Sequence, residues 1–138
     1  MNRSITGWIL CCSVGAALAV RLAQAHHSLA PVYDTTQQVS LEGVITHFHF
    51  VNPHPYLTLE VRPESAEAQQ WRLEMDNRRE LVEVGMDEQT LKAGDRVLVK
   101  GNPIRDGSRA LYIRVLDRPS DGFQYSQPGS SPQVRRGR

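Results

Sequence analysis

The residues of this chain best suited to chemistry are its 5 histidines, all of which fall between residues 26 and 54. His26 and His27 are adjacent, and His47 and His49 are two residues apart in a run rich in apolar side chains. Residues two apart on a β-strand point to the same face, so His47 and His49 can approach one metal ion together. Imidazole nitrogens suit both copper and zinc, and Cu(II) binds such donors more tightly. The sequence therefore predicts candidate ligands for a copper or zinc ion.

The fifth histidine, His54, lies in the turn Asn52-Pro53-His54-Pro55. The two prolines restrict this turn, so His54 has little conformational entropy to lose on binding a ligand. Asn52 is a further candidate site residue, and we expect its side chain to shape the turn by bonding nearby backbone. The alternative is that the histidines merely decorate the surface, because an i, i+2 pair without Cys or acidic partners is a weak motif.

The start of the chain has the three parts of a secretory signal peptide. Arg3 precedes an apolar run from Trp8 to Val20, and Ala23-Gln24-Ala25 places small residues before a cleavage point. We expect removal of residues 1–25, a periplasmic or secreted location, and no stable membrane span afterwards. His26 would then carry a free α-amine beside its imidazole, which resembles the copper histidine brace of oxidative polysaccharide-cleaving enzymes. Cleavage after Ala19 is the alternative, and it would remove this chelate.

Composition argues against several classes of protein. The chain has 16 Lys and Arg against 15 Asp and Glu, which lacks the basic excess of nucleic-acid-binding proteins, so we expect no nucleic-acid partner. Both cysteines, Cys11 and Cys12, lie within the predicted signal peptide, so the exported domain would contain no thiol or disulfide. No Gly-x-Ser-x-Gly nucleophile motif and no phosphate loop is present, and the sequence favours binding over catalysis.

The elements that position the histidines are predicted to be strands. Apolar residues alternate with polar ones in segments near 39–50, 56–61, 71–75, 96–100 and 110–116. Gly43 interrupts the first segment and predicts a bulge or bend there. Asn77 and Glu80 resemble a capping box, and Gly85 is a natural helix stop, so a short helix is expected between them. Three strands, a helix and two strands predict an all-β fold with one short helix, a small five-stranded OB-like barrel; another small barrel or a β-sandwich is the alternative.

The chain is expected to divide into four segments. These are a cleaved signal peptide (1–25), an extended N-terminal arm (26–37), the barrel (38–118) and a disordered tail rich in Ser, Gln, Pro and Gly (119–138). Trp71 and Phe123 are expected in or over the core. Basic residues on the last hairpin could hold a nucleic-acid strand, although a solvated sheet face is the favoured interpretation: Lys100, Arg105, Arg109, Arg114 and Arg118.

Several marks in combination resemble a family of uncharacterised exported bacterial proteins. They are His26-His27-Ser28, Tyr33-Asp34, Gly43-Val44-Ile45, Phe50-Val51-Asn52-Pro53-His54, Leu91-Lys92-Ala93-Gly94-Asp95, Gly101-Asn102-Pro103 and Arg105-Asp106-Gly107. The resemblance implies export and a small β domain, but no activity. Its His-His-Ser start and Asn-Pro-His turn again mark His26, His27, Asn52 and His54 as candidate site residues.

Three functions remain open from the sequence. The first is a binding module whose N-terminal arm and first hairpin hold a metal ion or small ligand. The second is an interaction module that docks on an unknown envelope protein by strand addition. The third is a copper-dependent enzyme, in which the same ligands leave one coordination position of the metal open. No residue of this chain requires such an activity. We take the first as the working hypothesis.

Overall fold

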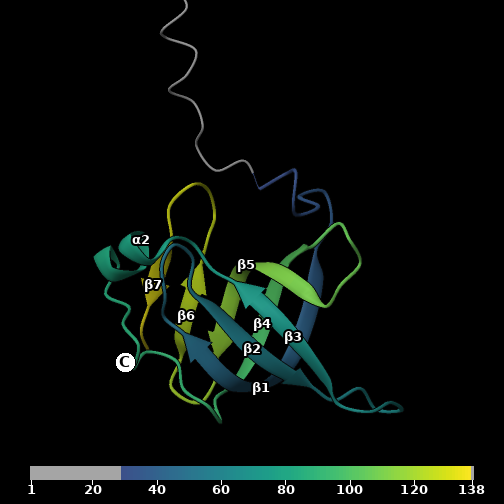
Figure 1. Cartoon of the computed structure of the whole chain (residues 1–138). Helices are drawn as coiled ribbons and strands as arrows, with labels where there is room; N and C mark the ends of the chain where they lie inside the picture. The colour runs from purple at the N-terminus through teal and green to yellow at the C-terminus, as the bar shows by residue number, and fades with distance from the viewer. Residues whose placement is uncertain (1–28, 138) are drawn as a thin grey trace, which may run out of the picture.

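The structure is a computed structural model that describes residues 29–137, shown in Figure 1. The predicted signal peptide and the two histidines that follow it, His26 and His27, lie outside these residues. The described chain forms one seven-stranded sheet and a short helix. Its elements are β1 Val39–His49, β2 Tyr56–Val61, β3 Gln69–Glu74, α2 Arg78–Glu83, β4 Arg96–Pro103, β5 Ala110–Arg118, β6 Phe123–Ser126 and β7 Gln133–Arg135.

The first five strands close into a barrel. The sheet order is β3-β2-β1-β4-β5-β6-β7, and a further parallel pairing of β3 with β5 joins the two ends of the five-strand part. The long strand β1 has two partners, because its first half pairs with β4 and its second half with β2. With α2 between β3 and β4, this is the strand order of an OB-fold. The predicted OB-like barrel is confirmed.

Gly43 lies where β1 passes from one partner strand to the other. A β-carbon at this position would lie closer than 3.0 Å to the backbone oxygen of Glu60 on β2, so a glycine is required for the approach of the two strands. The register irregularity of β1 falls further along, between Ile45 and His47. Of the bulge or bend predicted at Gly43, the bulge therefore lies further along β1, whereas Gly43 allows the close contact with β2 where β1 changes partner.

The inward faces of the strands form a single apolar core. On β2, Leu57 and Leu59 are fully buried and alternate with partly exposed residues, as a half-buried strand requires. Phe48 and Phe50 pack against this core from β1 and the residue after it, as their spacing predicts. Trp71 and Phe123 also join or cover the core.

The helix α2 forms where the capping pattern predicts it. The side chain of Asn77 accepts a hydrogen bond from the backbone N–H of Glu80, and Gly85 follows the helix with a φ of 83°. Leu81 turns inward and is fully buried. No helix within residues 29–137 is long and apolar enough to cross a membrane.

The segment after β5 is ordered, so the predicted disordered tail is wrong. β6 pairs with β5 and β7 pairs with β6, which extends the sheet beyond the barrel. Phe123 and Tyr125 bury their rings in the core, at 2% and 0% exposure. Two aromatic residues two positions apart were the signal of a strand here, and the Ser, Gln, Pro and Gly around them belong to its turns.

The described part of the N-terminal arm is folded onto the barrel instead of being simply extended. The backbone oxygen of Leu29 accepts hydrogen bonds from the N–H groups of Val32 and Tyr33, which makes a turn. Further bonds join Val32 to Arg105, and Tyr33 forms a bridge with Ile104. The arm is thereby fixed at one end of the barrel, near the loop that joins β6 and β7 (Figure 1).

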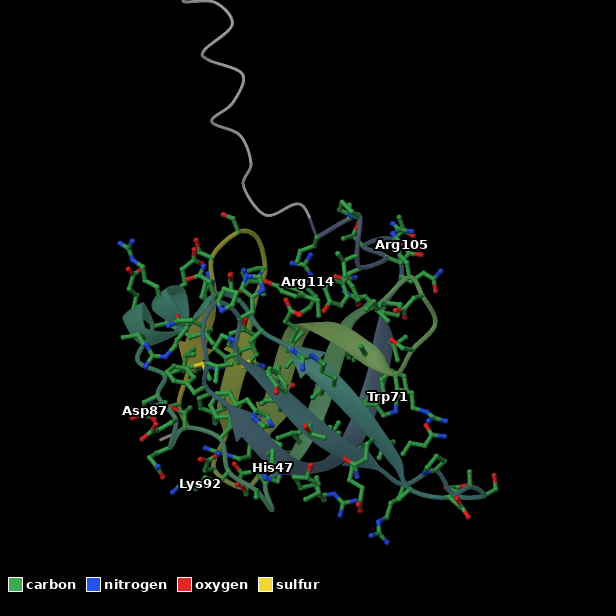
Figure 2. All side chains as sticks on the ribbon, viewed as in Figure 1. His47, Trp71, Asp87, Lys92, Arg105 and Arg114 are labelled. Atoms are coloured by element: carbon green, nitrogen blue, oxygen red, sulfur yellow. The ribbon has the colours of Figure 1, made fainter. Side chains whose placement is uncertain are left out.

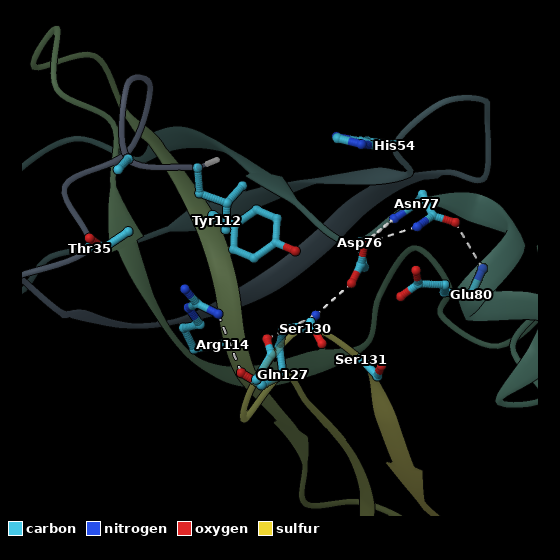
Figure 3. A pocket seen from close by; sticks show the side chains of 13 residues that line it. Thr35, His54, Asp76, Asn77, Glu80, Tyr112, Arg114, Gln127, Ser130 and Ser131 are labelled. Atoms are coloured by element: carbon cyan, nitrogen blue, oxygen red, sulfur yellow. Dashed lines mark hydrogen bonds between the residues drawn. The ribbon is translucent and has the colours of Figure 1, made fainter. Parts of the chain in front are cut away.

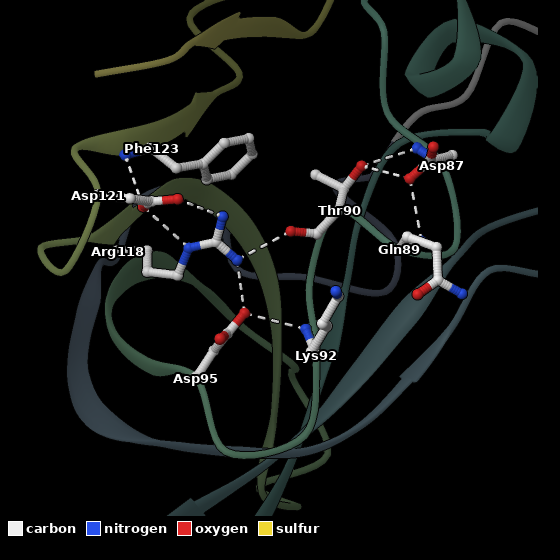
Figure 4. Close-up of polar contacts among 8 residues, drawn as sticks. All are labelled: Asp87, Gln89, Thr90, Lys92, Asp95, Arg118, Asp121 and Phe123. Atoms are coloured by element: carbon white, nitrogen blue, oxygen red, sulfur yellow. Dashed lines mark hydrogen bonds and ion pairs between the residues drawn. The ribbon is translucent and has the colours of Figure 1, made fainter. Parts of the chain in front are cut away.

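Arg105, Arg114 and Arg118 of the last hairpin are engaged in structural contacts, and Arg118 shows this most clearly (Figure 4). Its guanidinium donates to the backbone oxygen of Thr90 (2.8 Å) and to the carboxylates of Asp95 (2.5 Å) and Asp121 (2.8 Å). These bonds hold the pKa of the Asp121 carboxyl below its ordinary value. Arg118 also lies over the ring of Phe123. It therefore connects β5 both to β6 and to the loop that precedes β4.

Replacing Arg118 with methionine should destabilise the protein by about 2 kcal/mol, between the values for surface and buried ion pairs. The side chain is only 13% exposed, and its loss leaves Asp95 without its cation. Urea unfolding measures the change. The matched control is Arg79→Met, whose side chain is 88% exposed on α2 and should cost less than about 0.5 kcal/mol. An equal loss of stability in both variants would show that the contacts of Arg118 with Thr90, Asp95 and Asp121 do not stabilise the fold.

Candidate functional site

A pocket of about 610 Å³ lies at the end of the barrel where the arm docks. Four regions far apart in the sequence surround it: Leu29 and Ala30 of the arm, His54 of the β1–β2 turn, the segment Asp76–Glu80, and the face of β5 together with the chain after β6. Figure 3 shows their polar side chains directed toward a shared space. The pocket therefore gathers chemistry that no single motif contains.

His54 is oriented by two other side chains. Its Nδ1 lies 2.6 Å from Oε1 of Glu74, and the Tyr33 hydroxyl donates to the other oxygen of Glu74 at 2.9 Å. Burial, with the hydrogen bond to Glu74, raises the pKa of Tyr33, so its hydroxyl stays protonated and keeps donating. When the Glu74 carboxylate accepts a hydrogen bond from Nδ1–H, the neutral imidazole has its lone pair on Nε2. A carboxylate on the far nitrogen is the usual arrangement behind a metal-bound histidine.

The acidic wall of the pocket is formed by Asp76 and Glu80. Asp76 accepts hydrogen bonds from the backbone and side chain of Asn77 (2.6 and 3.2 Å) and from the side chain of Gln127 (2.5 Å). Glu80 has a different environment, because its Oε2 is buried and no hydrogen-bond partner for it is found in the described part of the chain.

A single arginine stands on the β5 wall of the pocket. The Arg114 Nε donates to the side-chain oxygen of Asn102 at 2.7 Å, and Nη1 lies 3.5 Å from the backbone oxygen of Gln127. Its guanidinium also lies 5.3 Å from the ring centre of Tyr112. Burial and the nearby charge of Asp76 raise the pKa of Tyr112, so its hydroxyl is protonated at neutral pH. The pocket thus presents both a fixed cation and fixed anions.

With this geometry established, the comparisons with known proteins give one result. Residues 14–112 match the sequence model of a family of unknown function, DUF6152, and the match covers more than half of the chain. The chain belongs to the DUF6152 family. No curated protein and no solved structure was found to match it. The resemblance to an uncharacterised family is confirmed.

His47 and His49 of this DUF6152 protein lie outside the pocket. Their rings are stacked with centres 5.5 Å apart, as expected for one face of a strand, and His49 stacks on Tyr56 at 4.3 Å. Arg72 lies over the same tyrosine ring at 3.5 Å. In Figure 2, His47 is at the lower end of the barrel and Arg114 of the pocket toward the upper end. The structure does not unite these two histidines with His54.

None of the remaining candidate residues, His26, His27 and Asn52, is among the described residues that line the pocket. His26 and His27 lie outside the described residues. Asn52 is exposed and does not line the pocket, and its side chain makes none of the backbone hydrogen bonds found among the described residues, so its predicted turn-shaping role is not seen. Within residues 29–137, no three His, Cys, Asp or Glu side chains are arranged to hold a metal ion.

Sequence reasoning missed most residues of this site. Glu74, Asp76 and Glu80 lie close together in the chain, but only the closed barrel brings them to Gln127 and to Arg114, which the sequence indicated only as a cation of the last hairpin. A partial signal was present in Glu74 and Asp76, polar residues at the end of a strand that precedes a helix cap. Such a position indicates a loop-borne site only once the neighbouring loops are known.

Proposed function

We propose that this protein is a small binding module of the periplasm or the extracellular space. In this proposal, its pocket holds a transition-metal ion through His54 and the histidines of the N-terminal arm. The location rests on the signal-peptide pattern of residues 1–25. Copper is the preferred ion, because nitrogen donors bind Cu(II) most tightly among the common divalent metals, and zinc is the second choice.

One observation carries this proposal: His54 lines the same pocket as Leu29 and Ala30. Those two residues follow His26-His27-Ser28 directly in the chain. Covalent geometry limits the Cα of His27 to about 7 Å from the Cα of Leu29, a residue that lines the pocket. The orientation of His54 by Glu74 supports the same interpretation, since outer-shell carboxylates fix metal-binding imidazoles.

The test is a Cu(II) titration, against a competing chelator, of protein that begins at His26. His54→Ala should weaken binding at least as much as loss of an outer-shell partner does, which is about 10- to 100-fold. His47→Ala is the matched control and should leave the affinity unchanged, because His47 lies outside the pocket. One extra residue before His26 should also weaken binding, because it removes the α-amine from the chelate.

Three outcomes would contradict the proposal. Equal copper affinity in the His54→Ala variant would remove the pocket from the metal site, and an equal loss in the His47→Ala variant would move it to the β1 face. Native protein that binds neither copper nor zinc would leave docking on an envelope protein as the remaining function. An unchanged affinity after N-terminal extension would remove only the amine from the ligand set.

A further inference from the structure

The pocket is much larger than a metal ion needs. Its volume of about 610 Å³ falls within the range of roughly 300–1,000 Å³ typical of small-molecule sites. Besides His54 and the arm, the charged side chains of Glu80, Asp76 and Arg114 line it. These charged side chains therefore need an explanation of their own.

Glu80 is the most informative of these residues. In a complete capping box, its carboxylate would accept a hydrogen bond from the backbone N–H of Asn77. Here that N–H donates to Asp76 instead, at 2.6 Å, and only the reverse bond from the Glu80 N–H to Asn77 forms, at 3.0 Å. The Glu80 carboxylate is thereby released from the helix cap and lines the pocket (Figure 3).

The released carboxylate is poorly satisfied by the protein. Its Oε2 is shielded from solvent and no partner for it is found within residues 29–137. A buried acceptor that is unpaired costs folding free energy, and the cost is larger when the group is charged. Asp76 adds a second negative charge on the same wall, where Gln127 and Asn77 hold it in place. Glu80 and Asp76 both line the pocket, so this wall is negatively charged and complements a ligand with a positively charged hydrogen-bond donor.

Arg114 supplies the opposite charge on the β5 side. Asn102 and the backbone of Gln127 hold its guanidinium, so little side-chain entropy is lost when it binds an anion. Arginine presents several N–H donors in a planar arrangement that suits carboxylates. The protonated hydroxyl of Tyr112 lines the same pocket and adds a neutral donor.

From these contacts we propose that the pocket binds a zwitterionic molecule of amino-acid or dipeptide size. Its ammonium group pairs with Glu80 and Asp76, and its carboxylate pairs with Arg114. The inference concerns the same pocket as the proposed metal site, but it does not require the metal. It also explains why one small pocket contains both signs of fixed charge.

The test is calorimetric titration with the dipeptide Ala-Ala in the presence of a chelator that removes divalent metal. Three matched probes separate the two charges: Ala-Ala itself, its N-acetyl form without the ammonium, and its C-terminal amide without the carboxylate. Because a charge-assisted hydrogen bond is lost in each case, both blocked forms should bind at least about tenfold more weakly than Ala-Ala. These three measurements use the unaltered protein, so no variant needs to fold.

Two substitutions then assign each charge to a residue. Glu80→Gln should weaken Ala-Ala binding at least about tenfold and leave the affinity for the N-acetyl form unchanged. Arg114→Gln should also weaken Ala-Ala binding, but it should leave the affinity for the C-terminal amide unchanged. Glu83→Gln, on the exposed face of α2 and 58% exposed, is the matched control and should change nothing. Absence of Ala-Ala binding, or equal binding of all three probes, would overturn the inference. The copper titration of the His54→Ala variant tests the proposed metal site independently of this result.

Discussion

Gly43→Ala is expected to lower the free energy of unfolding by about 3 kcal/mol, the upper part of the usual range for overpacking. The added methyl group would meet the backbone oxygen of Glu60 and the side chain of Leu59. A side chain can rotate away from such a contact, but the backbone of β2 can move only if β1 and β2 separate. Urea unfolding followed by circular dichroism measures the change.

A second glycine provides the control for this experiment. A β-carbon added at Gly129 would have no other atom within 4 Å, and the φ of Gly129 is not in the left-handed region. Gly129→Ala should therefore be neutral, or slightly stabilising through a more restricted unfolded chain. Equal stability of the Gly43→Ala variant and the unaltered protein would show that β1 and β2 are not as closely apposed as described.

Leu73→Ala should cost about 3 kcal/mol, within the range measured for buried leucine truncations. Leu73 is fully buried on β3, and its register partners are Leu57 on β2 and Leu111 on β5. It therefore stands at the pairing that closes the barrel. Since the next residue is Glu74, which orients His54, we also expect weaker copper binding in this variant. Urea unfolding and the copper titration measure the two effects separately.

Leu98→Ala is the matched control, because it removes the same atoms from a β4 residue that is 44% exposed. We expect a loss below about 0.5 kcal/mol. If both variants lost the same stability, burial at the closing pair would not explain the cost.

The barrel could be predicted from the sequence because alternation and turns are local signals. The capping pattern of Asn77 and Glu80 also predicted the helix, and the order of elements predicted the topology. The prediction for the tail was wrong because it rested on composition, whereas the burial of Phe123 and Tyr125 depends on a core that exists only after β5 is in place.

The site was predictable only in part. The spacing of His47 and His49 correctly predicts a shared face, and the stacking of their rings confirms it. Spacing says nothing about His54 and Glu74, which lie twenty residues apart in sequence and make their 2.6 Å contact through tertiary structure. The half-formed capping box shows a further limit: the sequence pattern is present, yet Asp76 competes successfully for the backbone donor.

The ordered segment after β5 has a consequence for how the family can vary. The family match ends at residue 112, whereas Arg114, Gln127, Ser130 and Ser131 of the pocket all follow it. Lengthening or shortening the loop between β6 and β7 would reshape one wall while every strand pairing of the closed barrel stayed in place. One wall of the pocket can thus vary separately from the strands that close the barrel, so a related protein can change what it captures without changing how it folds.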